Sequence, residues 1–325
     1  MRAIQVHEFG DPSVLKLVDV PTPVPGPGQV LVAVQAVGVN PAETYMRSGR
    51  YALLPTLPYI PGSDGAGIIR QVGPGVTGWQ ENDRVFFHGT AAGRSFGAYA
   101  ELAVCGTHQV FRLPANVGFS EGAAVPIPYA TAYQALVRKA AAQPGEIVLV
   151  HGASGGVGIA AVQLARWKQL RVIGTAGTSE GLELVRANGA HLAVSHKGAL
   201  YLDQVREAAN QGRGPDVILE MLANVNLDQD LDVLAPKGRI VVIGSRGRVE
   251  IDPRKIMSKD AAVLGVLLWN DSPEVLAPVF DDLIRGLEQG SLVPVVGREI
   301  PLAEAARAHD AVMEPGAYGK IVLVP

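Results

Sequence analysis

The chain has 325 residues, with 28 Lys plus Arg against 31 Asp plus Glu, 48% hydrophobic residues and one cysteine. This length suits two domains or one large α/β unit, and the composition excludes a disordered chain. The net charge of −3 excludes the basic excess of a dedicated nucleic-acid-binding protein. The lone cysteine, Cys105, excludes a disulfide framework and a multi-cysteine structural zinc site. We interpret Cys105 as a buried apolar group in a cytoplasmic protein.

Residues 1 to about 120 predict an irregular domain of short strands. The first residues alternate in polarity like a strand, which is unlike the apolar core of a secretory signal. Further strands are expected over residues 30–37, 67–72 and 84–87, because clusters of proline and glycine separate these apolar runs.

Beyond residue 126 the pattern changes to strands that alternate with helices. Strands are expected over residues 147–151, 170–175, 216–220 and 239–244, and helices end near residues 168 and 188. This alternation predicts a parallel sheet with crossover helices.

The pattern of the C-terminal segment predicts that the chain returns to the first domain. It offers a helix over residues 273–289, a short strand, a helix from about residue 302 and a final strand over residues 320–324. The apolar run 261–269 is far shorter than the roughly 20 residues that cross a bilayer, so we expect no membrane span.

A glycine-rich turn after the strand at 147–151 is the sharpest functional signal. Gly155, Gly156 and Gly158 separate this apolar strand from an alanine-rich helix. Glycines in this position let the backbone approach a pyrophosphate, which the amide groups at the helix start can bind. Ala153 departs from the commonest Gly-x-Gly-x-x-Gly pattern, but the flanking strand and helix support a dinucleotide loop.

The end of the next strand favours NADP(H) over NAD. NAD enzymes usually place an acidic residue about here to bind the ribose diol. Residues 177–179 contain no acid and offer space and hydroxyl groups for a 2′-phosphate. Lys197 and Arg246 are candidate cations for that phosphate. Glu180 opposes this interpretation because its carboxylate would repel a phosphate, unless the side chain points to solvent.

Beyond this loop, the chain resembles the medium-chain dehydrogenase/reductase superfamily from end to end. Within it, the chain is most similar to the zinc-free quinone oxidoreductase branch, and closest to the zeta-crystallin group. The segments that carry the superfamily likeness are residues 38–49, 61–67, 73–76, 83–85, 122–124 and 151–158, and those similar to zeta-crystallin are residues 220–226 and 244–247.

The same resemblance indicates that the catalytic zinc of alcohol dehydrogenases is lost here. Those enzymes place a cysteine where this chain has Asn40, and a histidine in the motif that reads Gly62-Ser63-Asp64 here. Without thiolate and imidazole ligands a tetrahedral zinc site has no ligand set. We therefore expect no metal, and chemistry that needs no Lewis acid.

The family fold implies a GroES-like, β-rich catalytic domain at residues 1–124 and 268–325. A Rossmann domain, with a doubly wound parallel sheet for NADP, would be inserted at residues 125–267. The active site would lie in the cleft. The apolar strand over residues 260–269 would sit late in the sheet, and pairing of its exposed edge predicts a homodimer, with a homotetramer as the zeta-crystallin alternative. An interior position for this strand is the other interpretation.

The resemblance also implies residue roles. Asn40 and Tyr45 are the catalytic candidates, Asn40 through a polar contact to the acceptor oxygen. Asn40 before Pro41 is equally a turn residue, Tyr45 a half-buried aromatic, and His196 a surface or capping histidine. Coenzyme contacts are implied for Tyr45, Thr131, Ser154, Gly155, Gly156, Val157, Gly177, His196, Asn226, Ile243, Gly244, Ser245, Arg246, Val266, Leu267 and Leu268.

The resulting functional hypothesis is NADPH-dependent quinone reduction, including one-electron transfer to ortho-quinones. A reductase of alkenal or enone double bonds is the alternative on the same scaffold, since it needs the same positioning of a hydride. Binding of AU-rich RNA or a structural crystallin role ranks below both, because the charge offers no basic stripe.

Overall fold

The computed structural model describes residues 1–89, 91 and 97–325. Its contacts divide the chain into two compact units. Unit 1 contains Met1–Ile127, Pro273–Glu314 and Gly319–Pro325, and unit 2 contains Pro128–Ser272 and Pro315–Tyr318. The expected boundaries after residues 124 and 267 lie three and five residues before these divisions. The short segment at 315–318 was expected in the first domain but packs with unit 2.

Unit 1 is built on strands from both ends of the chain. Its main sheet has the order β14-β15-β3-β4-β5-β7, with β6 paired to β3, while β1 and β2 form a separate pair. The strands are β1 (Arg2–Gln5), β2 (Lys16–Asp19), β3 (Gln29–Gly38), β4 (Asp64–Val72), β5 (Arg84–His88), β6 (Leu102–Gly106), β7 (Val110–Arg112), β14 (Val296–Pro301) and β15 (Lys320–Val324). The helices are α1 (Pro41–Arg47), α2 (Phe119–Ala123), α9 (Pro273–Glu288) and α10 (Ala305–Ala311).

The predicted return of the tail is seen in strand pairing. β15 pairs antiparallel with β3 through Val322 opposite Gly38, and β14 pairs parallel with β15. The final strand covers the predicted residues 320–324, and the helix expected from residue 302 begins as a 3-10 turn before α10. The buried apolar faces of these strands hold the tail against the first strands of the chain.

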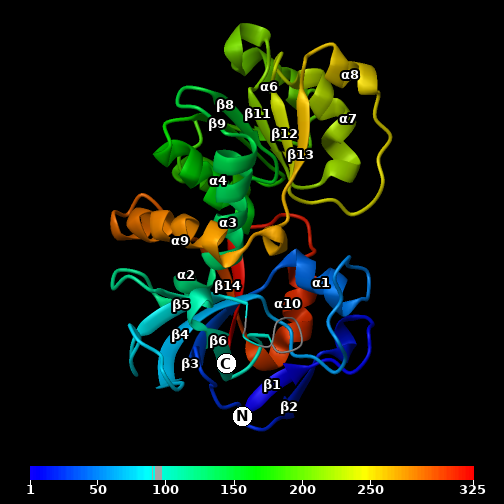
Figure 1. The fold of residues 1–325 in the computed structure, drawn as a ribbon. Helices are drawn as coiled ribbons and strands as arrows, with labels where there is room; N and C mark the ends of the chain where they lie inside the picture. The colour runs from blue at the N-terminus through cyan, green and yellow to red at the C-terminus, as the bar shows by residue number, and fades with distance from the viewer. Residues whose placement is uncertain (90, 92–96) are drawn as a thin grey trace. The chain divides into compact units, whose positions relative to one another are not determined.

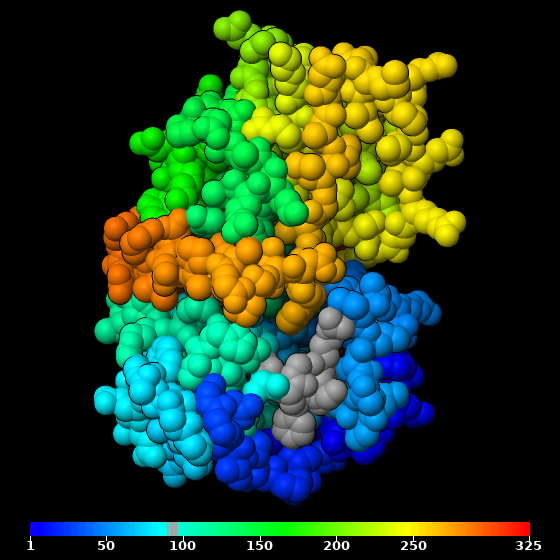
Figure 2. Space-filling model, in the orientation of Figure 1, coloured from blue at the N-terminus to red at the C-terminus, as the bar shows by residue number. Residues whose placement is uncertain are grey.

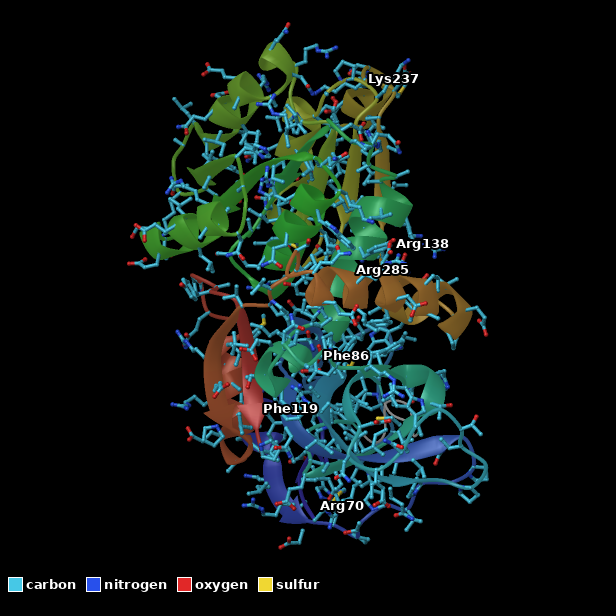
Figure 3. The ribbon with its side chains drawn as sticks, turned by 90° about the vertical axis from the view of Figure 1, so that its left-hand side faces the viewer. Arg70, Phe86, Phe119, Arg138, Lys237 and Arg285 are labelled. Carbon is cyan, nitrogen blue, oxygen red and sulfur yellow. The ribbon has the colours of Figure 1, made fainter. Side chains whose placement is uncertain are left out.

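An aromatic cluster packs α9 onto the sheet of unit 1. Phe280 of α9 lies with its ring centroid 4.1 Å from that of Phe111 and 6.0 Å from that of Phe86. Phe86 is labelled in Figure 3, within the sheet of this unit. Figure 2 shows α9, in orange, at the surface. The helix therefore buries one face and leaves the other to solvent, as its apolar spacing requires.

Unit 2 has the parallel sheet that the alternating pattern predicts. In the described residues the strand order is β10-β9-β8-β11-β12-β13, and neighbouring strands pair parallel throughout. The strands are β8 (Ile147–Val150), β9 (Arg171–Ala176), β10 (Leu192–Ser195), β11 (Val217–Glu220), β12 (Arg239–Val242) and β13 (Ala262–Gly265). The helices are α4 (Gly156–Trp167), α5 (Ser179–Ala187), α6 (Tyr201–Ala208), α7 (Ala223–Val233) and α8 (Pro253–Met257), and α3 (Pro126–Tyr133) leads in from unit 1.

Burial on both faces explains the composition of these strands. All four residues of β8 and all four of β11 are buried, as expected when helices cover both faces of a parallel sheet. Figure 1 shows β11, β12 and β13 side by side, with α7 and α8 beside them. The strand order reverses direction between β8 and β11, which is the point where such sheets bind ligands.

Two features of unit 2 differ from the sequence expectations. β10 was not predicted, because its four residues form a very short apolar run, although Gly189 and Gly198 lie on either side of it. The strand expected over residues 260–269 is only β13, and a 3-10 turn at Leu268–Asn270 follows it. β13 ends the strand order, so it is an edge strand rather than an interior one. Among the described residues, none of the helices is sufficiently long and apolar to cross a membrane.

Candidate functional site

The predicted dinucleotide loop joins β8 to α4. The chain leaves β8 at Val150, turns through Gly152 with a φ of +56°, and enters α4 after Gly155. Gly155 occupies the N-cap position but has no side chain that could accept from the first-turn amides. The N–H groups at the start of this helix are therefore free to bind an anion.

Close packing requires glycine at the third position of this turn, Gly158, and at Gly174 in the neighbouring strand β9. A Cβ atom on Gly158 would lie 2.4 Å from the carbonyl oxygen of Gly152 and 2.6 Å from Cα of Ala153. A Cβ atom on Gly174 of β9 would lie 2.9 Å from Cβ of Ala153. Helix, turn and strand thus approach one another at backbone distance, which is the packing role of glycine in a dinucleotide loop.

The basic side chains of His196 and Lys197 both lie beside Gly177, which follows β9. A Cβ atom on Gly177 would lie 2.8 Å from Nε2 of His196 and 3.6 Å from Cε of Lys197. Thr178 caps α5, because its hydroxyl oxygen accepts from the backbone N–H of Gly181 at 3.0 Å. Glu180 is exposed, and its carboxylate accepts a hydrogen bond from the Ser179 hydroxyl at 3.2 Å.

Arg246, the second predicted cation, lies elsewhere along the sheet. It follows β12, and the strands β8 and β11 stand between β12 and β9. Its backbone N–H donates to Oδ1 of Asn224 at 2.7 Å, while the side chain is exposed. Lys197, which follows β10 next to β9, is therefore the cation that neighbours Gly177.

The segment at 315–318 contacts the same loops. A Cβ atom on Gly155 would lie 3.5 Å from Cβ of Ala317, and one on Gly316 would lie 3.3 Å from Cγ2 of Thr178. Sequence analysis assigned no role to this segment, because contact with a loop some 160 positions earlier leaves no local pattern. It covers the start of α4 and the cap of α5.

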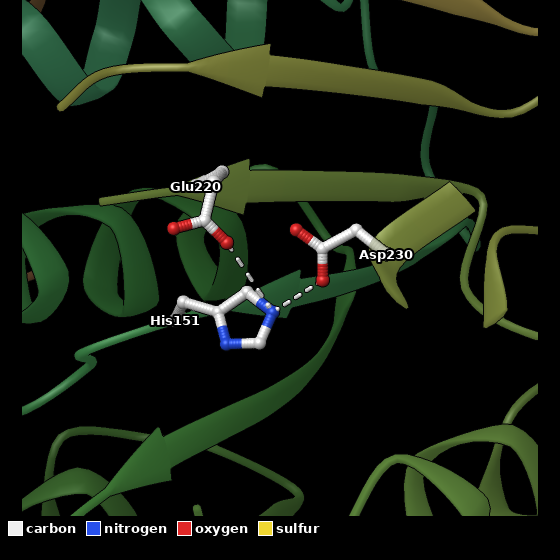
Figure 4. A group of neighbouring side chains, drawn as sticks. All are labelled: His151, Glu220 and Asp230. Atoms are coloured by element: carbon white, nitrogen blue, oxygen red, sulfur yellow. Dashed lines mark hydrogen bonds and ion pairs between the residues drawn. The ribbon is translucent and has the colours of Figure 1, made fainter. Parts of the chain in front are cut away.

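A buried polar triad stands beside the nucleotide loop (Figure 4). His151 directly follows β8, Glu220 ends β11 and Asp230 lies on α7. Nε2 of His151 lies 2.9 Å from Oδ1 of Asp230 and 3.6 Å from Oε2 of Glu220. Burial raises the pKa of Glu220 to about 8 and that of Asp230 to about 7, and burial lowers the pKa of His151.

Glu220 also holds the neighbouring loops. Its Oε1 accepts from the backbone N–H of Leu222, and both carboxylate oxygens lie 3.2 Å from Nδ2 of Asn226. Its backbone oxygen accepts from the N–H groups of Ile243 and Gly244 at 2.8 and 3.2 Å. Three residues that were predicted to contact the coenzyme, Asn226, Ile243 and Gly244, therefore lie together around the end of β11.

The other predicted residues of unit 2 lie on separate elements. Thr131 is half-buried on α3. Ser245 is exposed in the loop after β12, and its hydroxyl donates to the oxygen of Gly247 at 3.0 Å. Val266 and Leu267 are half-buried after β13, where the N–H of Val266 donates to Val242 at 3.2 Å, and Leu268 is buried.

Unit 1 contains a second buried polar network, centred on Asn40. Nδ2 of Asn40 donates to Oδ1 of Asp64 at 2.8 Å and to Oε1 of Glu43 at 3.2 Å. Its Oδ1 accepts from Nζ of Lys320, which also lies 3.6 Å from Oδ2 of Asp64. Both amide hydrogens of Asn40 are thus used within the protein, so donation to an acceptor oxygen would break one of these bonds.

Two aromatic residues extend this network. The Tyr99 hydroxyl donates to Oε2 of Glu43 at 2.8 Å and lies 3.2 Å from Nε2 of His309. Burial raises the pKa of Glu43, and the charge of Asp64 raises it further. Tyr45, the other catalytic candidate, is half-buried on α1.

Sequence analysis missed both networks apart from Asn40. Glu43 carried a usable signal, because an acid three residues after a helix-capping Asn predicts a capping box, and Oε2 of Glu43 accepts from the N–H of Asn40 at 3.0 Å. Glu220, at the end of an otherwise apolar strand, was a second signal. The sequence carried no signal for Lys320, because 280 positions separate it from Asn40.

Comparisons with known proteins give these two units a family. The model described as alcohol dehydrogenase GroES-like domain matches residues 26–115, and the model described as zinc-binding dehydrogenase matches residues 156–284. A human protein named quinone oxidoreductase is 47% identical over 326 residues, which covers 100% of this chain and 98% of that protein. The chain belongs to the quinone oxidoreductase branch of the medium-chain dehydrogenases/reductases. The predicted resemblance and fold class are confirmed.

Solved structures support the same family over the whole chain. Escherichia coli quinone oxidoreductase complexed with NADPH gives a TM-score of 0.89 at 27% identity and covers 100% of both chains. An NAD-dependent alcohol dehydrogenase gives a TM-score of 0.93 at 31% identity, again over 100% of both chains. Members of this family are oxidoreductases, and the prediction that the chain is an enzyme is confirmed.

Proposed function

We propose that this protein is an NADPH-dependent quinone oxidoreductase. The human relative carries that name, and the Escherichia coli structure of the same name holds NADPH. The observation that carries the proposal is the turn at Gly152–Gly158 of unit 2, where uncapped amides begin α4 and Gly158 leaves no room for a side chain.

The residues of unit 2 fit a bound dinucleotide. The N–H groups of Gly156 and Val157 would bind the pyrophosphate, next to the Ser154 side chain. Gly177 and His196 would lie around the adenosine, and the loops at Asn226 and 243–246 would complete the coenzyme site. These residues bind and orient the coenzyme, which supplies the hydride when bound.

Lys197 supports NADPH over NADH. Its Cε would lie 3.6 Å from a Cβ atom on Gly177, in the loop after β9 where a ribose 2′-phosphate would be bound. An ammonium group there would stabilise the phosphate through a charge-assisted hydrogen bond. Glu180 would oppose it, but this carboxylate is exposed and accepts from Ser179.

The network around Asn40 supports a reaction without zinc. The buried ammonium of Lys320 contacts both Asn40 and Asp64, which occupy the two motifs where alcohol dehydrogenases hold catalytic zinc. A positive charge in this place opposes binding of a divalent cation. A quinone needs no metal to accept a hydride, because its carbonyl oxygens already stabilise the added charge.

The enzymatic proposal is tested by an acceptor scan. The purified protein is mixed with NADPH or NADH, an ortho-quinone or a medium-chain enone, and EDTA. We expect oxidation of NADPH by the quinone, unchanged by EDTA and faster than with NADH. Turnover of the enone alone would favour the double-bond reductase, and loss of activity with EDTA would contradict the zinc-free mechanism.

The proposal extends to a cytoplasmic homodimer that pairs through β13. This strand ends the sheet, and the side chain of Val263 on it is 36% exposed. Unpaired edge strands tend to associate, and two-fold pairing covers the edge. We assign no RNA-binding role, because the net charge of −3 supplies no basic surface for phosphates.

A further inference from the structure

The buried triad of His151, Glu220 and Asp230 lacks a balancing positive charge. A ring nitrogen of His151 and one carboxylate oxygen from each of Glu220 and Asp230 all lie within 4.8 Å of one another, and all three residues are buried. Oδ2 of Asp230 is buried without a hydrogen-bond partner among the described residues. Two buried carboxylates with a neutral imidazole would be strongly destabilised, so the cluster needs a proton or another cation.

In the part of the chain that the structure describes, no Lys or Arg side chain forms an ion pair with the triad. The ring of Tyr201 on α6 packs edge-on against His151 with centroids 6.2 Å apart. His196 follows β10. Burial lowers the pKa of His196, and the charge of His151 has a smaller effect in the same direction. Nδ2 of Asn226 and the backbone N–H of Leu222 are uncharged donors to Glu220.

The contacts of the triad reach the loops that would receive the coenzyme. His151 immediately precedes the turn at Gly152. Glu220 binds the N–H of Leu222 and the amide of Asn226, and Asn224 in the same loop accepts from the backbone of Arg246. The triad therefore joins three segments that follow β8, β11 and β12.

We propose that His151, Glu220 and Asp230 share one proton in addition to the N–H proton of the neutral imidazole, and that this added proton positions the coenzyme-binding loops of unit 2. With the proton present, one carboxyl group donates to the other and the strand ends stay together. Without it, two carboxylates repel each other in a buried site, and the loops after β8 and β11 move apart. Asp230 is thus a positioning residue, which acts on the coenzyme through His151 and Glu220. This inference rests on the proposed coenzyme function.

The pKa directions agree with this geometry. Burial raises the pKa of Glu220 to about 8, and the negative charge of Asp230 contributes to this rise, while burial raises the pKa of Asp230 to about 7. Because both folded values exceed those of the unfolded chain, the stabilising proton is present at low pH and is lost as pH rises through about 7 to 8. Histidines of the unfolded chain titrate near pH 6.5, so most of their titration lies below the range of about pH 7 to 8.

The test compares the wild type with Asp230→Asn, whose amide cannot ionise, and with Asp228→Asn as a control on the same helix. Asp228 pairs with Lys255 at the surface, so its loss leaves the triad intact. NADPH affinity is measured by fluorescence at intervals from about pH 7 to about pH 9, where a 2′-phosphate is already ionised. We expect the Kd of the wild type and of the control to rise about tenfold, and that of Asp230→Asn to change less than about twofold.

A second readout needs no coenzyme. The unfolding midpoint of the free wild type should fall as pH rises from about 7 to about 8, where the folded chain still holds a proton that the unfolded carboxyl groups have lost, and should level off above about pH 8. The midpoint of Asp230→Asn should fall less, because only one carboxyl group remains in the cluster. If NADPH fails to bind at any pH, the proposed function fails while this readout still tests the shared proton. If Asp230→Asn does not fold, Glu220→Gln replaces it, because its amide supplies a permanent donor to Asp230.

Two outcomes would overturn the proposal. One is an equal dependence on pH in the wild type and the triad variants. The other is a fall of the wild-type midpoint on addition of EDTA, which would show that a metal ion supplies the missing positive charge.

Discussion

Nζ of Lys320, in the last strand of the chain, donates a hydrogen bond to Oδ1 of Asn40, 280 positions earlier. Both side chains are buried, and the ammonium also lies 3.6 Å from the carboxylate of Asp64. The contact joins β15 to the start of α1 and supplies a positive charge to a site that holds two buried carboxyl groups. It therefore couples the terminal strand to the stability of unit 1.

Replacement of this lysine should destabilise the fold. Lys320→Met leaves Asp64 without its buried counter-ion, and we expect a loss of about 3–5 kcal/mol in the free energy of unfolding. Chemical denaturation measures it, with Lys16→Met as the control because Lys16 is exposed on β2. The double variant with Asp64→Asn should recover part of the loss. A loss below about 1 kcal/mol in Lys320→Met would show that solvent reaches the site.

A methyl group at Gly158 should disrupt the nucleotide loop. Its Cβ would meet backbone atoms of Gly152 and Ala153 at 2.4 and 2.6 Å, and backbone cannot rotate away as a side chain can. We expect a loss of about 2 kcal/mol or more in Gly158→Ala, in the range of overpacking. Gly155→Ala is the matched control in the same turn, since its nearest contact is an ordinary 3.5 Å. Equal unfolding midpoints for the two variants would refute this packing argument.

Selection of the coenzyme should depend on Lys197. We expect Lys197→Ala to weaken NADPH binding about tenfold, which corresponds to about 1.4 kcal/mol, and to leave NADH binding nearly unchanged. Arg246→Ala should not alter the ratio of the two affinities, because Arg246 follows β12 and not β10. Titration of both coenzymes by fluorescence gives the four constants. A ratio that changes in Arg246→Ala but not in Lys197→Ala would reverse the assignment.

Cys105 should be inert in the folded protein. Its side chain is fully buried on β6, and burial raises the pKa of the thiol well above its usual range. Only the thiolate reacts readily with disulfide reagents. We expect no reaction with DTNB at about pH 8 in buffer and one thiol per chain after unfolding in guanidinium chloride. Fast labelling of the native protein would show that β6 opens in solution.

Assembly should be sensitive to charge on β13. We expect Val263→Lys to convert a dimer into a species of 34.1 kDa in light scattering, because a charge on an edge strand opposes pairing. Val225→Lys is the control, since Val225 is equally an exposed valine of unit 2 but lies on α7. A dimer that survives Val263→Lys would place the interface elsewhere.

The sequence determined the features that depend on local pattern. Apolar runs flanked by glycine and proline located β3, β5 and β8, and the turn at Gly155–Gly158 located the start of α4. These predictions succeeded because strand alternation, helix starts and glycine turns follow from neighbouring residues. The segments similar to a known family then indicated the order of the two domains.

Tertiary structure alone decided which charges meet. Asn40 carried a catalytic hypothesis, but its amide hydrogens are occupied by Glu43 and Asp64. The triad at His151 joins residues from β8, β11 and α7, and the segment at 315–318 joins unit 2 although its neighbours belong to unit 1. Such contacts arise when distant segments are buried together, and burial forces each polar group to find a partner that no local pattern specifies.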